Sequence, residues 1–206
     1  ASMADPRDPF GGHLDAGRSG GRRTAAPITI APIVGTASAQ VQAWPGRRAE
    51  LATALAPVGI HLPEGQSFTE SGGRLCGRIA PGRYLVLSDD TVADVAAAVP
   101  GAVGAVADLS HARAGVRITG PAVEALMAKG AAIDFSVAAF PPGRLAQTSI
   151  HHMGCLVLRR ADDVFDLYVL TSFAVSFADW LTDAAREFGW TTVAPAGLPV
   201  GAAAEA

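Results

Sequence analysis

Residues 139–160, AFPPGRLAQTSIHHMGCLVLRR, concentrate side chains that can bind metals or act as nucleophiles. Zinc binds imidazole nitrogens and thiolates, which His151, His152 and Cys155 could supply. A cysteine close to a histidine can also be a catalytic nucleophile, with the histidine as its base. In a regular strand His151 and His152 would point to opposite faces, so they could not bind one metal ion. Only one histidine could join Cys155, with no further donor at ligand spacing, so we expect neither a metal site nor a catalytic site here.

The remaining reactive groups also lack the context that their chemistry needs. The glycine-rich run 11–21 has no strand before it and no helix after it, so it does not predict a phosphate-binding turn. Asp108, Ser110 and His111 match a catalytic triad in letters only, without a nucleophile elbow. Asp162 and Asp163 are typical of a turn. We therefore expect no catalytic residue and no cofactor or metal bound by this chain.

Composition indicates a folded protein with a thinly charged surface. Of 206 residues, 50% are hydrophobic and 17% are charged, and such a surface favours coverage by a partner. The net charge of −3 argues against binding nucleic acid, and no apolar run predicts a signal peptide or a membrane span. Two cysteines without a CxxC spacing favour a reduced, cytoplasmic setting.

The elements that must position these side chains lie between a polar, glycine-rich N-terminal stretch and a C-terminal stretch of small residues. We expect a flexible arm over residues 1–26, a folded body over 27–190 and a flexible tail over 191–206. The body divides into two strand–helix halves, about 27–107 and 108–190. Short links between strands favour hairpins, so we predict an α+β fold of mostly antiparallel sheets with flanking helices on one side.

The elements of the first half are predicted from hydrophobic periodicity and from the residues that break or turn the chain. Residues 46–60 contain a short helix that Pro57 ends. The chain then continues into a strand at Ile60 and Leu62. A hairpin over 73–90 turns at Pro81–Gly82, and Asp89 or Asp90 caps a helix that Pro100 ends.

The second half repeats this order. A strand or strand pair over 105–120 precedes a helix that Pro121 opens and Gly130 ends. Three strands follow, over 145–152, 155–160 and 164–170, with turns at Met153–Gly154 and Ala161–Asp163. The last helix, over 172–190 and capped by Ser172, has one apolar face that we expect to be core: Phe173, Phe177, Trp180, Leu181, Ala184 and Phe188.

Three blocks in the second half carry a family resemblance. They are DLSHARAGVRITGPAVEALMAKG, AFPPGRLAQTSI and DLYVLTSFAVSFADWLTDAAREFG, and they run from Asp108 to Gly189. In order and spacing they closely resemble the gamma subunit of heterotetrameric sarcosine oxidase, and the FPPGR–AQT segment is specific to it.

The resemblance implies a subunit of a bacterial flavoprotein complex. Such a complex demethylates sarcosine oxidatively to glycine, passes the one-carbon unit to tetrahydrofolate and produces hydrogen peroxide. It further implies alpha, beta and delta partner subunits, with alpha in direct contact, and places FAD, FMN, NAD and zinc in those partners. The fold is expected to resemble part of the aminomethyltransferase, or T-protein, of glycine cleavage.

The chain departs from T-protein-like domains at one informative place. Where the family's wider superfamily has an acidic pair that orients folate, this sequence reads His151-His152-Met153-Gly154-Cys155. A carboxylate base is therefore missing there, and we expect a non-catalytic scaffold. Two alternatives stay open: a subunit of a related demethylase such as N-methylglutamate dehydrogenase, or an autonomous folate-binding aminomethyl carrier or transferase.

Five residues are the candidates for a subunit interface. Arg22 and Arg23 could pair with acidic groups of a partner, and Pro141, Pro142 and Arg144 belong to a rigid turn ahead of a strand.

Overall fold

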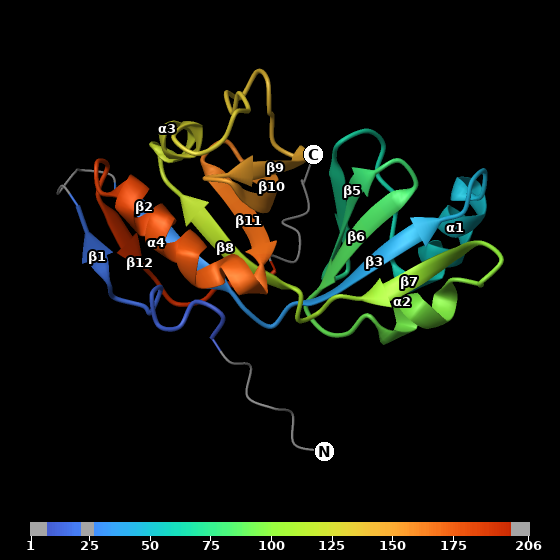
Figure 1. Cartoon of the computed structure of the whole chain (residues 1–206). Helices are drawn as coiled ribbons and strands as arrows, with labels where there is room; N and C mark the ends of the chain where they lie inside the picture. Colours follow the sequence, from blue (N-terminus) through green and yellow to red (C-terminus); the bar gives the residue numbers. More distant parts are fainter. Residues whose placement is uncertain (1–7, 22–26, 199–206) are drawn as a thin grey trace, which may run out of the picture.

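The computed structural model describes residues 8–21 and 27–198 (Figure 1). The α-helices are α1 (Arg48–Leu55), α2 (Ala93–Ala98), α3 (Val123–Ala128) and α4 (Ala174–Ala185), with single 3₁₀ turns η1 (Ala56–Val58) and η2 (Thr171–Phe173). The strands are β1 (Ser19–Gly20), β2 (Ile28–Ile33), β3 (Ala37–Ala43), β4 (Phe68–Ser71), β5 (Arg74–Ala80), β6 (Arg83–Ser88), β7 (Gly104–Asp108), β8 (Arg113–Thr119), β9 (Leu145–Ile150), β10 (Met153–Ala161), β11 (Val164–Leu170) and β12 (Trp190–Thr192).

The strands form two sheets. Sheet A has the order β1-β12-β2-β8-β11-β10-β9, and sheet B has the order β4-β5-β6-β3-β7. Neighbouring strands are antiparallel, except that β12 runs parallel to β2. The predicted α+β class with mostly antiparallel sheets is thereby confirmed.

Each sheet is covered by helices on one face and by the other sheet on its opposite face. Helices α3 and α4 pack on sheet A, and α1 and α2 pack on sheet B (Figure 1). A third apolar cluster joins the sheets, to which sheet B contributes Leu75, Leu85 and Leu87, and sheet A contributes Leu145, Leu156, Leu158 and Tyr168. The expectation of helices on one side was wrong, because each sheet has its own outer helix layer.

The sequence of strand β10 is almost continuously apolar because the strand lies between two layers. Cys155 and Val157 face the helices, whereas Leu156 and Leu158 face sheet B. Both faces are buried, so both sets of alternate positions must be apolar.

The chain passes between the sheets twice within the body. Strand β2 lies in sheet A and β3 in sheet B, and the chain returns from β7 in sheet B to β8 in sheet A. The predicted first half, 27–107, therefore contributes its first strand to the sheet of the second half.

Several boundaries differ from those predicted at the ends of the body. Within the expected arm, Phe10 and Leu14 are buried and Ser19–Gly20 pairs with β12. Within the expected tail, Leu198 is buried. Both segments bury apolar side chains, although the polar arm and the small residues of the tail predicted that neither would pack against the body.

Local predictions inside the body also need correction. Residues around Ile60 and Leu62 form no strand, and β4 begins only at Phe68. Neither α2 nor α4 has a side-chain cap, so Asp89, Asp90 and Ser172 do not have the predicted roles. A further helix residue, Phe173, is 42% exposed instead of buried.

Candidate functional site

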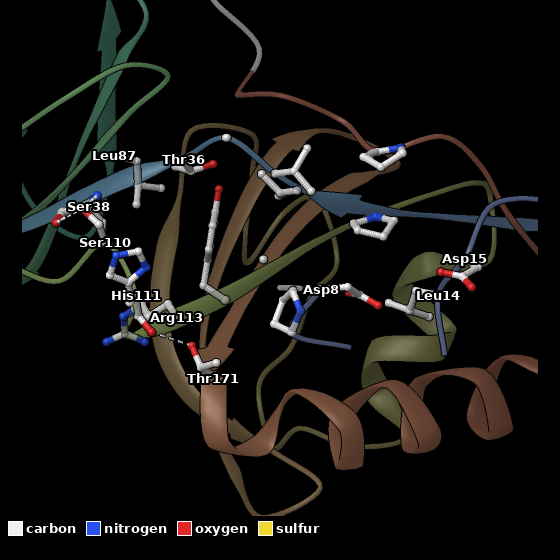
Figure 2. Close-up of a pocket in the computed structure, with 18 of the residues that line it drawn as sticks. Asp8, Leu14, Asp15, Thr36, Ser38, Leu87, Ser110, His111, Arg113 and Thr171 are labelled. Atoms are coloured by element: carbon white, nitrogen blue, oxygen red, sulfur yellow. Dashed lines mark hydrogen bonds between the residues drawn. The ribbon is translucent and has the colours of Figure 1, made fainter. Parts of the chain in front are cut away.

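A cavity of about 900 Å³ opens beside the place where the chain crosses between the sheets. Its walls come from the β2–β3 connection, the β7–β8 connection, β11 and the segment that begins at Asp8. Figure 2 shows Ser38, Ser110, His111 and Arg113 gathered on one side of the cavity, and Asp8, Leu14 and Asp15 on the other.

Three of the lining residues have a buried polar atom without a hydrogen-bond partner among the described residues. These atoms are Thr36 Oγ1, Arg113 Nε and Tyr168 Oη. Tyr168 is only 3% exposed, and burial raises the pKa of its hydroxyl, which therefore stays protonated. Burial lowers the pKa of the Arg113 guanidinium from its ordinary value, yet an arginine remains charged. These three polar atoms are thus buried in the wall of the cavity without a partner among the described residues.

A glycine leaves room for the Tyr168 ring. Gly115 of β8 lies opposite Tyr168 of β11, and a Cβ at residue 115 would lie 2.7 Å from Tyr168 Cε1. Such a contact is too close for a real side chain, so glycine at residue 115 leaves the space that the Tyr168 ring occupies at the cavity wall.

The serine of the triad-like set has a structural role. Ser110 Oγ donates to Asp108 Oδ1 at 2.7 Å, and the Ser110 backbone N–H donates to the same oxygen at 2.9 Å. These hydrogen bonds hold the pKa of the Asp108 carboxyl below its usual value. Ser110 Oγ also accepts the Ser38 N–H at 3.1 Å, so it ties the β7–β8 connection to β3. Among the described residues Ser110 has no hydrogen bond to His111.

The two adjacent histidines form a hairpin turn. Ile150 pairs with Met153, which leaves His151 (φ 48°) and His152 (φ 66°) as the two central residues. Two positive φ values define a type I′ turn. The predicted turn at Met153–Gly154 and the placement of the histidines on opposite faces of a strand were therefore wrong. The imidazole centroids lie 5.8 Å apart, and that of His151 stacks on Trp180 at 6.0 Å.

Metal binding and thiol chemistry have no geometric support in the described part of the chain. No group of three or more histidine, cysteine or acidic side chains lies within reach of one ion in residues 8–21 and 27–198. Cys76 and Cys155 are free and buried, in the cores of sheet B and sheet A. Burial raises the pKa of each thiol to about 12, so neither is a nucleophile at neutral pH.

The FPPGR run is a tight turn at the boundary between the sheets. The Arg144 N–H donates to Pro141 O at 3.2 Å, with Pro142 second in the turn and Gly143 third at φ 86°, which is a type II turn. Arg144 forms a bridge with Ser67 ahead of β4. Pro141 and Pro142 are exposed, and Arg144 is half-buried with no partner for Nε among the described residues. The other interface candidates, Arg22 and Arg23, lie outside the described residues.

Arg159 holds the segment that precedes this turn. Its side chain is fully buried, and Nη1 donates to Phe135 O at 2.6 Å and Phe140 O at 3.0 Å. Nη2 donates to Glu124 Oε1 at 2.5 Å, and the guanidinium lies 4.9 Å from the Phe165 ring centroid. These contacts satisfy a buried cation with carbonyl and carboxylate oxygens, so Arg159 has a structural role.

A second group of charges joins the two sheets. Arg117 donates to both carboxylate oxygens of Asp166, at 2.6 and 2.7 Å, and Arg160 of sheet A pairs with Glu70 of sheet B. Burial lowers the pKa of Arg117, but the hydrogen bonds and charge of Asp166 outweigh this and raise it. Burial raises the pKa of Glu70, which the Arg160 charge opposes.

The lining residues Thr36, Arg113 and Tyr168 were not singled out from the sequence. The alternation in β8 does place Arg113 and Arg117 on the face opposite Ala114, Val116 and Ile118. This pattern indicates one polar face, but it does not tell whether that face meets solvent or a second sheet.

Comparison with solved structures defines the class of protein first. The fold matches the glycine cleavage system aminomethyltransferase T from Bartonella henselae with a TM-score of 0.55 and 15% identity, over 88% of this chain and 49% of that chain. It matches a heterotetrameric sarcosine oxidase from Corynebacterium sp. U-96 with a TM-score of 0.75 and 23% identity, over 88% of this chain and 95% of that chain. The chain therefore has an aminomethyltransferase-like fold, as the resemblance implied.

Sequence comparison then identifies the family. The model of the sarcosine oxidase gamma subunit family matches residues 47–187. The sarcosine oxidase subunit gamma of an Arthrobacter species is 27% identical over 176 residues, which cover 83% of this chain and 86% of the relative. That of Corynebacterium sp. strain U-96 is 25% identical over 185 residues, which cover 88% and 89%. The chain belongs to the sarcosine oxidase gamma subunit family.

Proposed function

We propose that this chain is the non-catalytic gamma subunit of a heterotetrameric sarcosine oxidase and that it contacts the alpha subunit. In this proposal alpha, beta and delta hold FAD, FMN, NAD and zinc, and the complex produces glycine and hydrogen peroxide while tetrahydrofolate receives the one-carbon unit. Family membership and the match to a heterotetrameric sarcosine oxidase support the assembly. The free, buried cysteines agree with a cytoplasmic setting.

The observation that carries the scaffold role is an exposed apolar group where β11 leads into α4. Leu170, Phe173 and Val175 are 44%, 42% and 42% exposed within six consecutive residues. Large apolar side chains grouped on a surface mark an interface with a partner. We call these three residues the junction patch. The turn formed by Pro141, Pro142 and Arg144 remains a second proposed contact.

The chemistry of the described residues supports a non-catalytic role. Ser110 is engaged by Asp108, and both thiols are buried. His151 and His152 form a turn where the resemblance implies the acidic pair of T-protein-like domains. Neither histidine supplies the carboxylate that would orient folate there.

Assembly is tested by co-expressing the full chain with its alpha, beta and delta partners. We expect Phe173→Asp to reduce the amount of this chain that co-purifies with alpha at least about tenfold, because a carboxylate would be buried without a partner. Val137→Asp is the matched control, since Val137 is 44% exposed and lies outside the junction patch. Thermal unfolding of each variant alone checks that it folds. Normal assembly of the Phe173→Asp variant would contradict the proposed patch.

The scaffold role itself is tested by omitting this chain from the co-expression. We expect less assembled alpha–beta–delta complex, with the turnover per assembled complex retained. If yield and turnover were both unchanged, the scaffold role would fail. Titration calorimetry of the isolated chain with tetrahydrofolate separates the scaffold from a folate-binding transferase, because tight binding would favour the transferase. Turnover of sarcosine against N-methylglutamate by the assembled complex decides the substrate.

A further inference from the structure

Strand β7 is an open edge of sheet B. It pairs with β3 on one side, and no strand among the described residues pairs with it on the other (Figure 1). Ala105, Ala107 and Asp108 of this strand are exposed. The other edges are less open, because β1 is two residues long and β4 meets the chain ahead of β9, where the Phe68 N–H donates to Gly143 O at 3.2 Å.

The hydrogen-bond pattern of the ladder shows which backbone groups of β7 face outward. Just ahead of the strand, Val103 O accepts the Trp44 N–H at 2.9 Å. Hydrogen-bonded and non-hydrogen-bonded pairs alternate in an antiparallel ladder, so every second residue counted from Val103 bonds with β3. Val106 and Asp108 therefore direct their backbone N–H and C=O groups away from β3, and these groups have no partner among the described residues.

The sequence of β7 lacks the features that protect an exposed edge from pairing. Such edges in natural proteins carry a lysine, a proline or a bulge. Strand β7 reads GAVAD, and its register with β3 runs without a bulge from Gly104 to Asp108. An unprotected edge of this kind suits an extended segment of another chain, which adds to the sheet through its backbone.

The edge of β7 is continuous with the junction patch. The connection that follows β7 is bound to Thr171, which lies between the first two members of the patch. The Thr171 N–H donates to Ala112 O at 3.0 Å, and Thr171 Oγ1 donates to His111 O at 2.9 Å. At the other end of the edge Trp44 is 41% exposed, and its indole N–H donates to Gly101 O at 2.8 Å. The edge therefore runs from the junction patch to a tryptophan, a residue type enriched at the centres of interfaces.

We propose that the alpha subunit adds an extended segment to β7 as the next strand of sheet B. The backbone of this segment bonds with the outward N–H and C=O groups of Val106 and Asp108. Asp108 is the one charged residue of β7, so a lysine or arginine is favoured beside it and an acidic residue is disfavoured. This inference rests on the proposed function and adds the place and the mode of the contact.

A substitution at residue 106 tests the backbone contact. Val106→Pro removes an N–H that points away from β3, so the ladder of sheet B keeps its hydrogen bonds. Val106→Ala is the matched control, because it also removes part of this half-buried side chain but keeps the N–H. Thermal unfolding of each variant alone checks that it folds.

Incorporation into the complex is measured by competition. Each variant is co-expressed with the wild-type chain and with alpha, beta and delta, and mass spectrometry gives the ratio of the two chains in the purified complex. We expect Val106→Pro to be depleted at least about fivefold and Val106→Ala less than about twofold. Equal depletion of the two variants would overturn the inference.

Hydrogen exchange of the wild-type chain gives a second readout, which holds even if Val106→Pro fails to fold. The amides of Val106 and Asp108 should exchange at least about tenfold more slowly in the assembled complex than in the free chain. Assembly without this protection would overturn the inference and leave the proposed function intact, whereas failure of the wild-type chain to assemble would overturn both. A dimer of the isolated chain that Val106→Pro abolishes would also overturn the inference, because a second copy would then occupy the edge.

Discussion

At the scale of single residues, His151 and His152 form a turn that their residue types did not predict. Type I′ turns favour asparagine and glycine, which adopt positive φ at low cost. Because His151 and His152 offer neither signal, alternation alone predicted that the strand continued through them. Arg113 and Tyr168 were not predicted to line a cavity for a different reason. The cavity forms only where the two sheets meet, and part of its wall comes from residues far away in the sequence.

The backbone conformation of His152 leads to a stability prediction. His152 is exposed with φ 66°, so His152→Gly should raise the free energy of unfolding by about 0.5–1 kcal/mol, because the relief of strain exceeds the added entropy of the unfolded chain. Urea unfolding measures the change. His152→Val is the control and should lower stability, since a β-branched residue fits this conformation worse. Equal stability of both variants would show that the turn is not strained.

At the scale of elements, the strands of the second half were predicted best. The strands over 145–152, 155–160 and 164–170 correspond to β9, β10 and β11, and the hairpin at Pro81–Gly82 is present between β5 and β6. Alternation and turn residues are local signals, so they suffice for such hairpins. Helix caps were predicted wrongly, because α2 and α4 begin without side-chain caps, although both helices start within two residues of the predicted positions.

The face of α4 gives a matched pair of substitutions. Phe177 is fully buried between α4 and sheet A, so Phe177→Ala should cost about 3–5 kcal/mol of the free energy of unfolding. Phe173→Ala should cost less than about 1 kcal/mol in the isolated chain, because Phe173 is 42% exposed. Chemical denaturation of both variants tests the difference, and similar losses would mean that the helix does not have the orientation described.

At the scale of the whole molecule, the two-sheet arrangement could not be predicted from the sequence. The hydrophobic pattern shows which residues are buried but not which sheet each strand joins, and β2 joins sheet A although the next strand joins sheet B. The family resemblance implied a fold similar to that of an aminomethyltransferase, which the structural match confirms, but it did not assign the strands to two sheets.

The charges between the sheets lead to a prediction at this scale. Asp166 is fully buried and binds Arg117 through both carboxylate oxygens, so Asp166→Ala should cost about 3–5 kcal/mol by leaving a buried cation without its partner. Asp183→Ala is the control, because Asp183 is 3.8 Å from Arg186 at the surface and its removal should change stability by less than about 0.5 kcal/mol. Equilibrium unfolding of both variants in urea measures the losses, and a small loss for Asp166→Ala would contradict the role of the ion pair.

The strand order of sheet A has a consequence for how the chain folds during synthesis. All strands of sheet B lie between residues 37 and 108, whereas β2 of sheet A must pair with β8 and with β12 at residues 190–192. On the ribosome sheet B can therefore close first, while β2 waits for partners that emerge about 80 and 160 residues later. During that interval the apolar run of β2 has neither neighbour, which makes it the segment most in need of protection from aggregation before the nascent chain is complete.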